Sequence, residues 1–175
     1  MEIRPAREDD WSQIYPIFAA IVAGGRTYAY PEGLPSGEAK ALWMEPPPGR
    51  AVVAVDGNRV LGSAKMGPNR PGRGAHVATA SFMVDPAAQG RGVGRALGEH
   101  VVAWARDAGY RAMQFNAVVE TNTGAVRLWQ SLGFRILTTV PGAFDHAEHG
   151  YVGLHGDVPG ALSLRGGRRS ARVRG

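Results

Sequence analysis

Residues 84–96 read Val-Asp-Pro-Ala-Ala-Gln-Gly-Arg-Gly-Val-Gly-Arg-Ala. An apolar run, Ala78–Val84, leads into this segment and predicts a strand that stops at the proline. The stretch Val93–Ala108 has apolar residues at helical spacing over roughly four turns and predicts an amphipathic helix. The sequence therefore indicates a strand, a glycine-rich loop and a helix in direct succession.

The glycine-rich loop has the residue types of an anion-binding site. Gly90, Gly92 and Gly94 let consecutive backbone N–H groups approach an anion without interference from a Cβ atom. The following helix adds its positive N-terminal dipole, and Arg91 and Arg95 bring charge-assisted donors to the same place. We interpret the segment as a phosphate-binding loop; the alternative is a solvated glycine-rich turn before a helix.

Two common phosphate loops do not fit this segment. The Walker loop requires Gly-Lys followed by Ser or Thr, and the chain contains no Gly-Lys pair. The dinucleotide fingerprint Gly-x-Gly-x-x-Gly would place its last glycine at Arg95 or Leu97, and Arg111 stands where its acidic partner is expected. The sequence therefore excludes a P-loop NTPase and a Rossmann-type dinucleotide site.

The pattern that remains is Gln-x-x-Gly-x-Gly, formed by Gln89, Gly92 and Gly94 after Phe-Met-Val-Asp-Pro. It resembles the pyrophosphate motif with which the GCN5-related N-acetyltransferases (GNAT) hold acetyl-CoA. A second segment, residues 122–134, reads Asn-Thr-Gly-Ala-Val-Arg-Leu-Trp-Gln-Ser-Leu-Gly-Phe and is similar to the family's Asn-x-x-Ala-x-x-Leu-Tyr-x-x-x-Gly-Phe. The resemblance implies an α/β fold, a single GNAT-like domain with a mixed central β-sheet flanked by helices.

The rest of the chain supplies elements for such a domain. Asp56-Gly57-Asn58 predicts a hairpin turn, and Asp9 and Asp10 predict the cap of a helix that runs to about Val22. The segment 156–160 interrupts the last apolar run, so we expect the final strand to be short or absent. The expected strands lie near Ile3 and at residues 51–55, 59–65, 76–84, 112–119, 134–140 and 151–154; further helices are expected at 36–45, 93–108 and 122–133.

Composition narrows the class of protein. The 175 residues are 44% hydrophobic, which suits one globular domain with a sizeable core. The absence of cysteine excludes disulfides, thiolate metal sites and a cysteine acyl-enzyme. The first residues lack the apolar stretch of a signal peptide, and no run of about 18 apolar residues occurs. We therefore expect a soluble, cytoplasmic protein that does not enter a membrane.

The positive charge is concentrated at one end of the chain. Five of the 20 Lys and Arg residues lie among the last eleven residues, which leaves 15 basic against 15 acidic residues in the remainder. We therefore expect an N-acetyltransferase domain over residues 1–160 and a Gly/Arg-rich tail over 161–175. Nucleic acid is not an expected partner because the domain itself is neutral; binding through the tail is the alternative.

The resemblance also assigns the residues that contact acetyl-CoA. In the family, the strand before the glycine loop splays from the next strand, and the pantetheine arm bonds to its backbone as an added strand would. The main chain of Phe82, Met83 and Val84 would supply those bonds, with the amide of Phe82 or Met83 as oxyanion donor to the thioester carbonyl. The cofactor set is completed by Gln89, Gly90, Arg91, Gly92, Val93, Gly94 and Arg95 at the pyrophosphate and by Asn122.

One departure from the family concerns the acid that protonates the departing thiolate. Trp129 occupies the place of the family's tyrosine, and its indole donates a hydrogen bond but cannot release a proton. Because a thiol has a pKa of about 8.5, the loss of this acid threatens only a few kcal/mol, and water could replace it. We retain Trp129 as a candidate catalytic residue; plain core packing is the alternative.

A second departure from the family concerns the base that removes a proton from the acceptor amine. The strand before the loop, residues 75–84, contains no acid, only His76 and Thr79. The acceptor can arrive as a neutral amine and lose its proton to water, or Glu120 can act as base; a solvated loop charge is the alternative interpretation of Glu120. We expect His76 to satisfy a loop backbone group.

Three histidines raise the question of a metal. His146 and His149 are three residues apart, and His155 comes directly after the next predicted strand. The pair lies in a Gly/Pro-rich loop without a carboxylate of clear geometry, so we expect no metal site.

A narrower resemblance concerns the acceptor. The segment 76–143, with Phe115-Asn116 and Val-Pro-Gly at 140–142, is similar to the azetidine-2-carboxylate acetyltransferase branch, in which a residue matching Asn116 orients a small cyclic amine. Thr79 holds the place of that branch's second asparagine. We expect direct acetyl transfer from acetyl-CoA to a small amino-acid-like or cyclic amine, without a metal. Alternatives are a structural partner for Asn116 and a catalytically weak acyl-CoA-binding regulatory module; the sequence leaves a homodimer open.

Overall fold

The computed structural model describes residues 1–156 and 162–163. The tail expected at 161–175 therefore lies outside the described residues, apart from Leu162 and Ser163. In chain order the elements are β1 (Glu2–Pro5), η1 (Glu8–Asp10), α1 (Trp11–Ala23), α2 (Ser36–Trp43), β2 (Arg50–Asp56), β3 (Arg59–Pro68), η2 (Gly72–Gly74), β4 (Val77–Val84), η3 (Pro86–Ala88), α3 (Val93–Asp107), β5 (Ala112–Met113), β6 (Ala117–Val119), α4 (Thr123–Ser131), β7 (Thr139–His146), β8 (Gly150–Gly156) and β9 (Leu162–Ser163).

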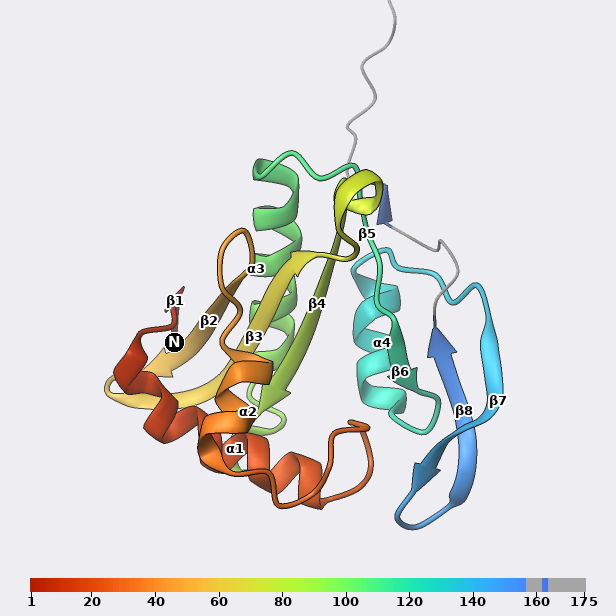
Figure 1. The fold of residues 1–175 in the computed structure, drawn as a ribbon, viewed down its shortest axis with the longest axis horizontal. Helices are drawn as coiled ribbons and strands as arrows, with labels where there is room; N and C mark the ends of the chain where they lie inside the picture. The colour runs from red at the N-terminus through yellow and green to blue at the C-terminus, as the bar shows by residue number, and fades with distance from the viewer. Residues whose placement is uncertain (157–161, 164–175) are drawn as a thin grey trace, which may run out of the picture.

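The strands form two sheets. The larger has the order β1-β2-β3-β4-β5-β9 and is antiparallel except for β4 and β5, which are parallel because α3 crosses between them. The smaller has the order β6-β8-β7. Figure 1 shows α3 behind the larger sheet and α1 and α2 in front of it. The mixed sheet flanked by helices confirms the expected α/β fold. None of the helices in the described ranges is long and apolar enough to cross a membrane.

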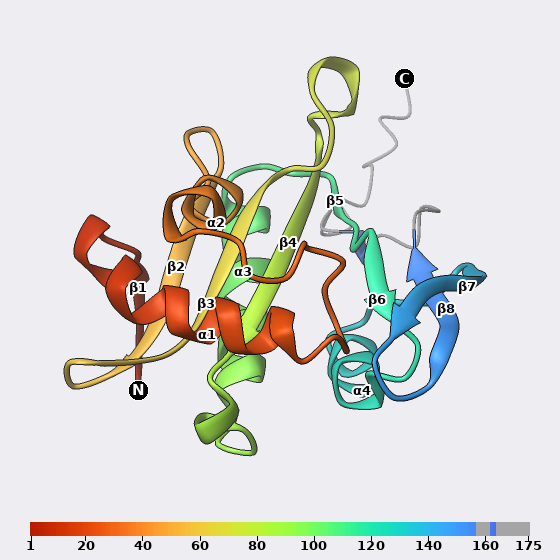
Figure 2. The same cartoon turned by 60° about the horizontal axis from the view of Figure 1, so that its bottom comes forward.

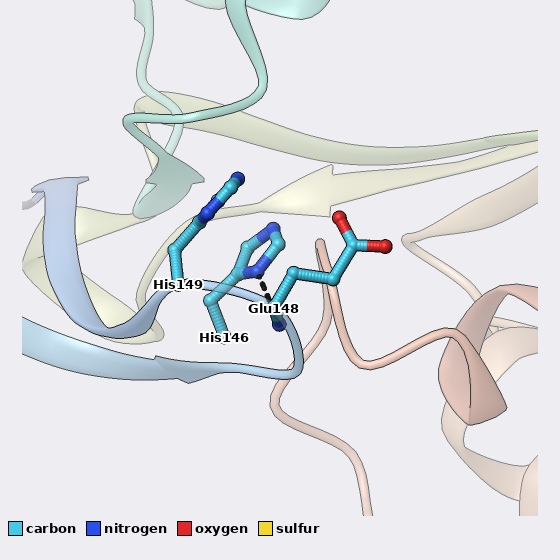
Figure 3. A group of neighbouring side chains, drawn as sticks. All are labelled: His146, Glu148 and His149. Atoms are coloured by element: carbon cyan, nitrogen blue, oxygen red, sulfur yellow. Dashed lines mark hydrogen bonds between the residues drawn. The ribbon is translucent and has the colours of Figure 1, made fainter.

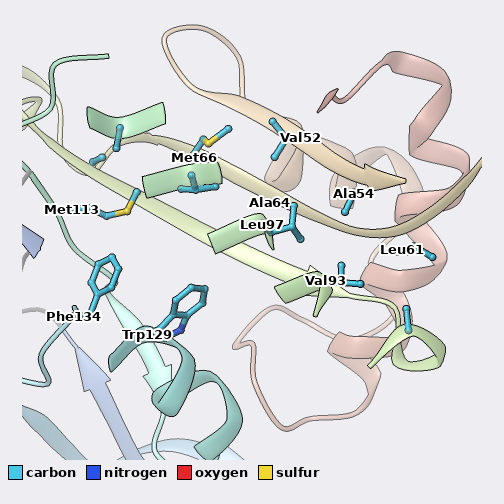
Figure 4. Packing of buried hydrophobic residues seen from close by; sticks show 14 residues of the cluster. Val52, Ala54, Leu61, Ala64, Met66, Val93, Leu97, Met113, Trp129 and Phe134 are labelled. Carbon is cyan, nitrogen blue, oxygen red and sulfur yellow. The ribbon is translucent and has the colours of Figure 1, made fainter. Parts of the chain in front are cut away.

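Two apolar clusters hold the helices against the larger sheet. On one face, α3 buries Val93, Leu97, Val101 and Ala105, spaced four residues apart. Burial of each larger aliphatic side chain stabilises the fold by about 1.5–3 kcal/mol. This cluster, drawn in Figure 4, continues through β4 to Trp129 on α4, so the same core positions both helices beside the larger sheet. The opposite face carries the residues Trp11, Ile14, Ile17, Phe18, Val22, Ala39, Trp43, Val53, Val55, Val60 and Met83.

The larger sheet opens after residue 78. Strands β4 and β5 pair only at Val77–Ala112 and Ala78–Met113, and β6 then joins the second sheet. The single strand expected at 112–119 is therefore wrong: residues 114–116 separate β5 from β6. The physical reason is a change of strand partner: the Gln114 N–H still donates to the Ala78 carbonyl of β4 at 2.9 Å, whereas from Ala117 the chain pairs with β8. Figure 2 shows the resulting separation between β4 and β6.

The strand expected at residues 134–140 is wrong in most of its length. Residues 134–138 are irregular, and β7 begins at Thr139. Phe134 is buried in the core while Ile136 and Leu137 are 42% and 49% exposed, so the alternation of a half-buried strand is not kept. Strand β8 spans seven residues and pairs with both β6 and β7, so it is longer than the strand expected at 151–154, whereas the final described strand, β9, has two residues and is short, as expected.

The N-terminal cap differs in detail from the expectation. Asp10 ends the short turn η1 and makes no side-chain cap of α1. Its carboxylate instead accepts hydrogen bonds from both terminal nitrogens of Arg4, at 2.7 and 2.8 Å, and from the Arg7 N–H at 2.7 Å. The Arg4 guanidinium holds the pKa of Asp10 below its usual value. The hairpin turn at Gly57, by contrast, is confirmed between β2 and β3.

Candidate active site

The glycine-rich loop ends in an exposed helix N-terminus. Gly90 and Gly92 have φ angles of +76° and +78°, which a side chain rarely tolerates, and Gly92 caps α3. The first bond inside the helix runs from the Ala96 N–H to the Gly92 carbonyl at 3.0 Å. The N–H groups before Ala96 therefore have no partner within the helix. This geometry suits an anion such as a pyrophosphate, as the sequence predicts.

The two loop arginines lie at the rim of this site. Arg91 pairs with Asp56 at 3.0 Å, and Arg95 donates to the Ser131 hydroxyl at 3.0 Å. Both guanidinium groups are about half exposed, so these contacts are weak and can be exchanged for an anion. Arg95 lines the cavity described below, whereas Arg91 is not among its lining residues.

Strand β4 presents an unpaired edge next to the loop. The bonds from the Asn69 N–H to the Val77 carbonyl and from the Asp85 N–H to the Leu61 carbonyl show that odd-numbered residues of β4 face β3. The even-numbered ones, including Phe82, face the opening, where β4 has no strand partner beyond residue 78 in the described chain. This free edge is the splay that the family resemblance implies.

The three predicted pantetheine contacts are therefore not equivalent. Phe82 and Val84 direct their main chain to the free edge and line the cavity. Met83 directs its main chain to Ser63 on β3, and its side chain is buried on the α1 and α2 face. Of the two oxyanion donors considered from the sequence, the Phe82 N–H is the one at the free edge.

A hydroxyl group already contacts that amide. Tyr28 lies in the loop between α1 and α2, and its hydroxyl accepts from the Phe82 N–H at 2.9 Å and donates to the Phe82 carbonyl at 2.7 Å. Burial raises the pKa of the Tyr28 phenol above its usual value. The loop is fixed from its other side because the Ala147 N–H donates to the Gly25 carbonyl at 2.9 Å.

One cavity of about 820 Å³ joins the glycine-rich loop, the free edge of β4 and the loop between α1 and α2. Besides the glycine-rich loop, its lining includes Tyr28, Tyr30, Glu45, Lys65, Thr79, Asn116 and Phe144. Within the described residues, Glu45 is the only acidic side chain that lines it. Lys65 reaches Glu45 at 3.3 Å and donates to the Leu42 carbonyl at 2.7 Å. A cation and an anion thus lie together in an otherwise largely apolar and neutral chamber.

Asn116 lies in this cavity, between β5 and β6. Its Nδ2 donates to the Asn69 Oδ1 at 2.6 Å, so the amide does have a structural partner. Its Oδ1 is buried and finds no hydrogen-bond donor among the residues that the structure describes. A buried amide oxygen without a donor costs about 1–3 kcal/mol, so a ligand donor there would be favourable.

Glu120 and Trp129 take different positions. The Glu120 carboxylate accepts the Gly153 N–H, and the residue is not part of the cavity lining. Trp129 does line the cavity, but it is only 9% exposed, and its ring lies 4.6 Å from Phe82 and 4.7 Å from Phe115. These contacts fit the core-packing interpretation of Trp129.

Asn122 begins α4 at the cavity wall. Its Oδ1 accepts the Ala125 N–H at 3.2 Å, so the side chain caps the helix while the residue lines the cavity. Gln89, Gly90, Gly92, Val93 and Gly94 line the same wall of the cavity.

The histidines have local partners. His76 Nδ1 lies 3.0 Å from the Arg73 carbonyl, which confirms its expected loop contact. His146, Glu148 and His149 gather at the β7–β8 turn, with potential ligand atoms within 4.8 Å of one another. Figure 3 shows the His146 ring between His149 and the Glu148 side chain, whose carboxylate pairs with Arg26. The His146 Nδ1 accepts the Glu148 N–H at 3.1 Å. The absence of a metal stays a prediction.

Three functional candidates were not identified from the sequence in these roles. Tyr28 lies outside both sequence motifs, and its hydroxyl contact with Phe82 joins residues 54 positions apart, which no local pattern reveals. Glu45 follows the end of α2, Lys65 lies on β3, and the two side chains form an ion pair. The only available signal was Lys65 itself, a charge within an apolar strand.

Comparisons with known proteins agree with this geometry. Residues 11–134 match the model of the acetyltransferase (GNAT) family. The structure is similar to that of a GCN5-related N-acetyltransferase from Kribbella flavida, with 60% identity and a TM-score of 0.86, over 88% of this chain and 94% of that one. It is also similar to yncA from Salmonella typhimurium, solved with its cofactor acetyl-CoA, at 25% identity and a TM-score of 0.76 over 95% of each chain.

Among curated proteins, the N-acetyltransferase aca1 of Schizosaccharomyces pombe is 34% identical over 90 residues, which are 51% of this chain and 43% of that protein. The chain spans less than half the length of the curated relatives that it matches.

Proposed function

We propose that this chain, which belongs to the GNAT acetyltransferase family, transfers the acetyl group of acetyl-CoA directly to the amine of a small, amino-acid-like molecule. The observation that carries the proposal is the continuity of one cavity from the glycine-rich loop, along the free edge of β4, to the chamber that holds Glu45 and Lys65. A long cofactor with a charged end and a reactive end fits such a path.

The fit to acetyl-CoA follows from the groups along the cavity. The helix N-terminus after Gly92 and the side chain of Arg95 would bind the pyrophosphate. The amides of the pantetheine arm would pair with the even-numbered residues of β4, as an added strand does. The proposal is supported by the similar structure of yncA, which was solved with its cofactor acetyl-CoA.

The chemistry then takes place beside Phe82. The lone pair of the acceptor nitrogen attacks the thioester carbon, the C–S bond breaks with its electron pair on sulfur, and the proton lost by nitrogen ends on the thiol. The Phe82 N–H stabilises the negative charge that develops on the carbonyl oxygen. Because the chain has no cysteine, no thioester with the protein can form, and positioning carries much of the rate.

The proposed class of acceptor rests on the ion pair between Glu45 and Lys65 in the cavity lining. A zwitterion presents an ammonium and a carboxylate that complement Glu45 and Lys65, and the open Oδ1 of Asn116 offers a further acceptor. A polyamine would require several anions, but the chamber supplies one. Azetidine-2-carboxylate, the acceptor of the branch that the segment 76–143 resembles, has the required carboxylate and amine.

Paired acceptors test this proposal. Azetidine-2-carboxylate and azetidine differ only in the carboxylate, so the ratio of their kcat/KM values reports recognition of that group. We expect the carboxylate to raise kcat/KM at least tenfold in the wild-type protein. Equal values for both members, or a strong preference for polyamines, would overturn the assignment of the acceptor class.

A second candidate is an acyl-CoA-binding regulatory module with weak chemistry. It is favoured by Trp129 at the place of the family's tyrosine, and by the location of Glu120 outside the cavity lining. Both candidates predict acetyl-CoA binding, so turnover separates them.

A further inference from the structure

Tyr28 occupies a position with chemical consequences. Its hydroxyl bonds to both main-chain groups that Phe82 turns to the free edge of β4, at 2.9 Å from the nitrogen and 2.7 Å from the oxygen. The ring is held by stacking on Tyr30, at 5.5 Å, and by an edge contact with Trp43, at 6.1 Å. The hydroxyl is therefore positioned by packed rings.

We propose that Tyr28 is a second oxyanion donor, whose O–H bonds to the thioester carbonyl oxygen together with the Phe82 N–H. This inference rests on the proposed function, because it concerns the same thioester. It assigns a role to a side chain outside both sequence motifs, on the loop between α1 and α2.

The hydrogen-bond geometry leads to this role. An oxygen that accepts from the Phe82 N–H must lie about 2.9 Å from that nitrogen, which is the distance at which the Tyr28 hydroxyl now lies. The arriving carbonyl oxygen therefore displaces the phenol oxygen from this position, with a shift of the Tyr28 side chain that keeps the two oxygens within hydrogen-bond distance of each other. A hydroxyl rotates about its C–O bond, so the O–H that now points to the Phe82 carbonyl can turn to the new oxygen. The Phe82 carbonyl is then available to a pantetheine amide.

The phenol acts as a donor and keeps its proton. Burial raises the pKa of Tyr28, so the hydroxyl stays neutral throughout the neutral pH range. Proton transfer to a thiolate, whose conjugate acid has a pKa of about 8.5, would be strongly uphill from such a phenol. A neutral hydrogen bond to the developing oxyanion needs no proton transfer and strengthens as negative charge builds up on oxygen.

The kinetic test compares two phenols that contact the loop between α1 and α2. Tyr28→Phe removes the hydroxyl at Phe82, while Tyr15→Phe removes a hydroxyl that donates to the Leu34 carbonyl of that loop and lies outside the cavity lining. We expect Tyr28→Phe to lower kcat by about 10²-fold with little change in the KM for acetyl-CoA, since one oxyanion donor is lost. Tyr15→Phe should retain kcat within a few fold. Equal kcat values for wild type and Tyr28→Phe would overturn the inference.

An infrared measurement separates donation from a structural role. Acetyl-CoA labelled with carbon-13 at the carbonyl reports the strength of hydrogen bonds to that oxygen, because donors lower its stretching frequency. Bound to Tyr28→Phe, the carbonyl should absorb at a higher frequency than when bound to wild type or to Tyr15→Phe. Replacement of Tyr28 by 3-fluorotyrosine, which keeps the shape and makes the hydroxyl a stronger donor, should lower the frequency further; an unmoved band in both replacements would overturn the inference.

The wild-type arm distinguishes this inference from the proposed function. If wild type neither binds acetyl-CoA in calorimetry nor releases CoA, the proposed function fails and the role of Tyr28 fails with it. If wild type binds and turns over while Tyr28→Phe keeps both its kcat and its carbonyl frequency, only the role of Tyr28 is wrong.

Discussion

Gly92→Glu tests the glycine-rich loop most sharply. At this position φ is +78° and a Cβ atom would meet nothing within 4 Å, so the substitution introduces backbone strain but no clash. A left-handed conformation costs a side chain about 1–2 kcal/mol, which leaves a domain of this size folded. A carboxylate about 4 Å from one pyrophosphate charge costs about 4 kcal/mol at an effective dielectric constant of 20, which corresponds to roughly 10³-fold in affinity.

The matched control is Gly109→Glu. Gly109 follows the other end of α3, has a φ angle of +82°, and its Cβ position is likewise open, so strain and charge are the same. Calorimetry with acetyl-CoA should show near wild-type affinity for Gly109→Glu and a loss of at least 10²-fold for Gly92→Glu, with similar thermal unfolding of the two variants. Gly94→Glu, with helical φ, should also lose binding. Wild-type affinity in Gly92→Glu, or equal losses in both variants, would refute the reasoning.

Four further outcomes are expected. Asn116→Ala should lower turnover by the equivalent of about 1–3 kcal/mol and leave acetyl-CoA affinity unchanged in calorimetry; unchanged turnover would remove this residue from the site. Lys65→Met should raise the KM for azetidine-2-carboxylate about tenfold and leave the KM for azetidine unchanged, since only azetidine-2-carboxylate has a carboxylate that the Lys65 ammonium can bind. Asp10→Asn should destabilise the fold by about 1.5–3 kcal/mol at pH 7 in urea titrations, because Arg4 loses a charged partner. Because the folded pKa of Asp10 is lowered, this difference should be present above about pH 4 and disappear as the pH falls through the folded pKa; a pH-independent difference would contradict the ion pair. Titration of the wild-type protein with Zn²⁺ should show no saturable site at the histidines of the β7–β8 turn; saturable binding that is lost in His149→Ala would contradict this expectation.

Local signals were sufficient for much of the fold. Gly57 has a φ angle of +58° in the turn between β2 and β3, and a glycine between Asp56 and Asn58 predicts such a turn from the sequence alone. The glycine-rich loop was likewise identified because its glycines, the preceding proline and the amphipathic helix are contiguous. In each case the residues that determine the structure are neighbours in the sequence.

The remaining features depend on contacts between distant residues. The break between β5 and β6 comes with the change of partner from β4 to the distant strand β8, and the residues 112–119 alone look like one strand. The cap expected at Asp10 was lost to Arg4, which competes for the same carboxylate. The contact of Tyr28 with Phe82 and the pairing of Lys65 with the α2 exit exist only once the sheet and the α1–α2 loop are assembled.

Acetyl transfer itself is the most direct test of the proposed function. The wild-type protein is mixed with acetyl-CoA and a panel of amines that includes azetidine-2-carboxylate, aromatic amines, aminoglycosides, polyamines and peptides, and both free CoA and acetylated amine are measured. The proposal predicts one acetylated amine for each CoA released, greatest for a small amino-acid-like acceptor, with no release in Gly92→Glu. Confirmed acetyl-CoA binding with no CoA release above background for any amine would contradict it and favour the regulatory module.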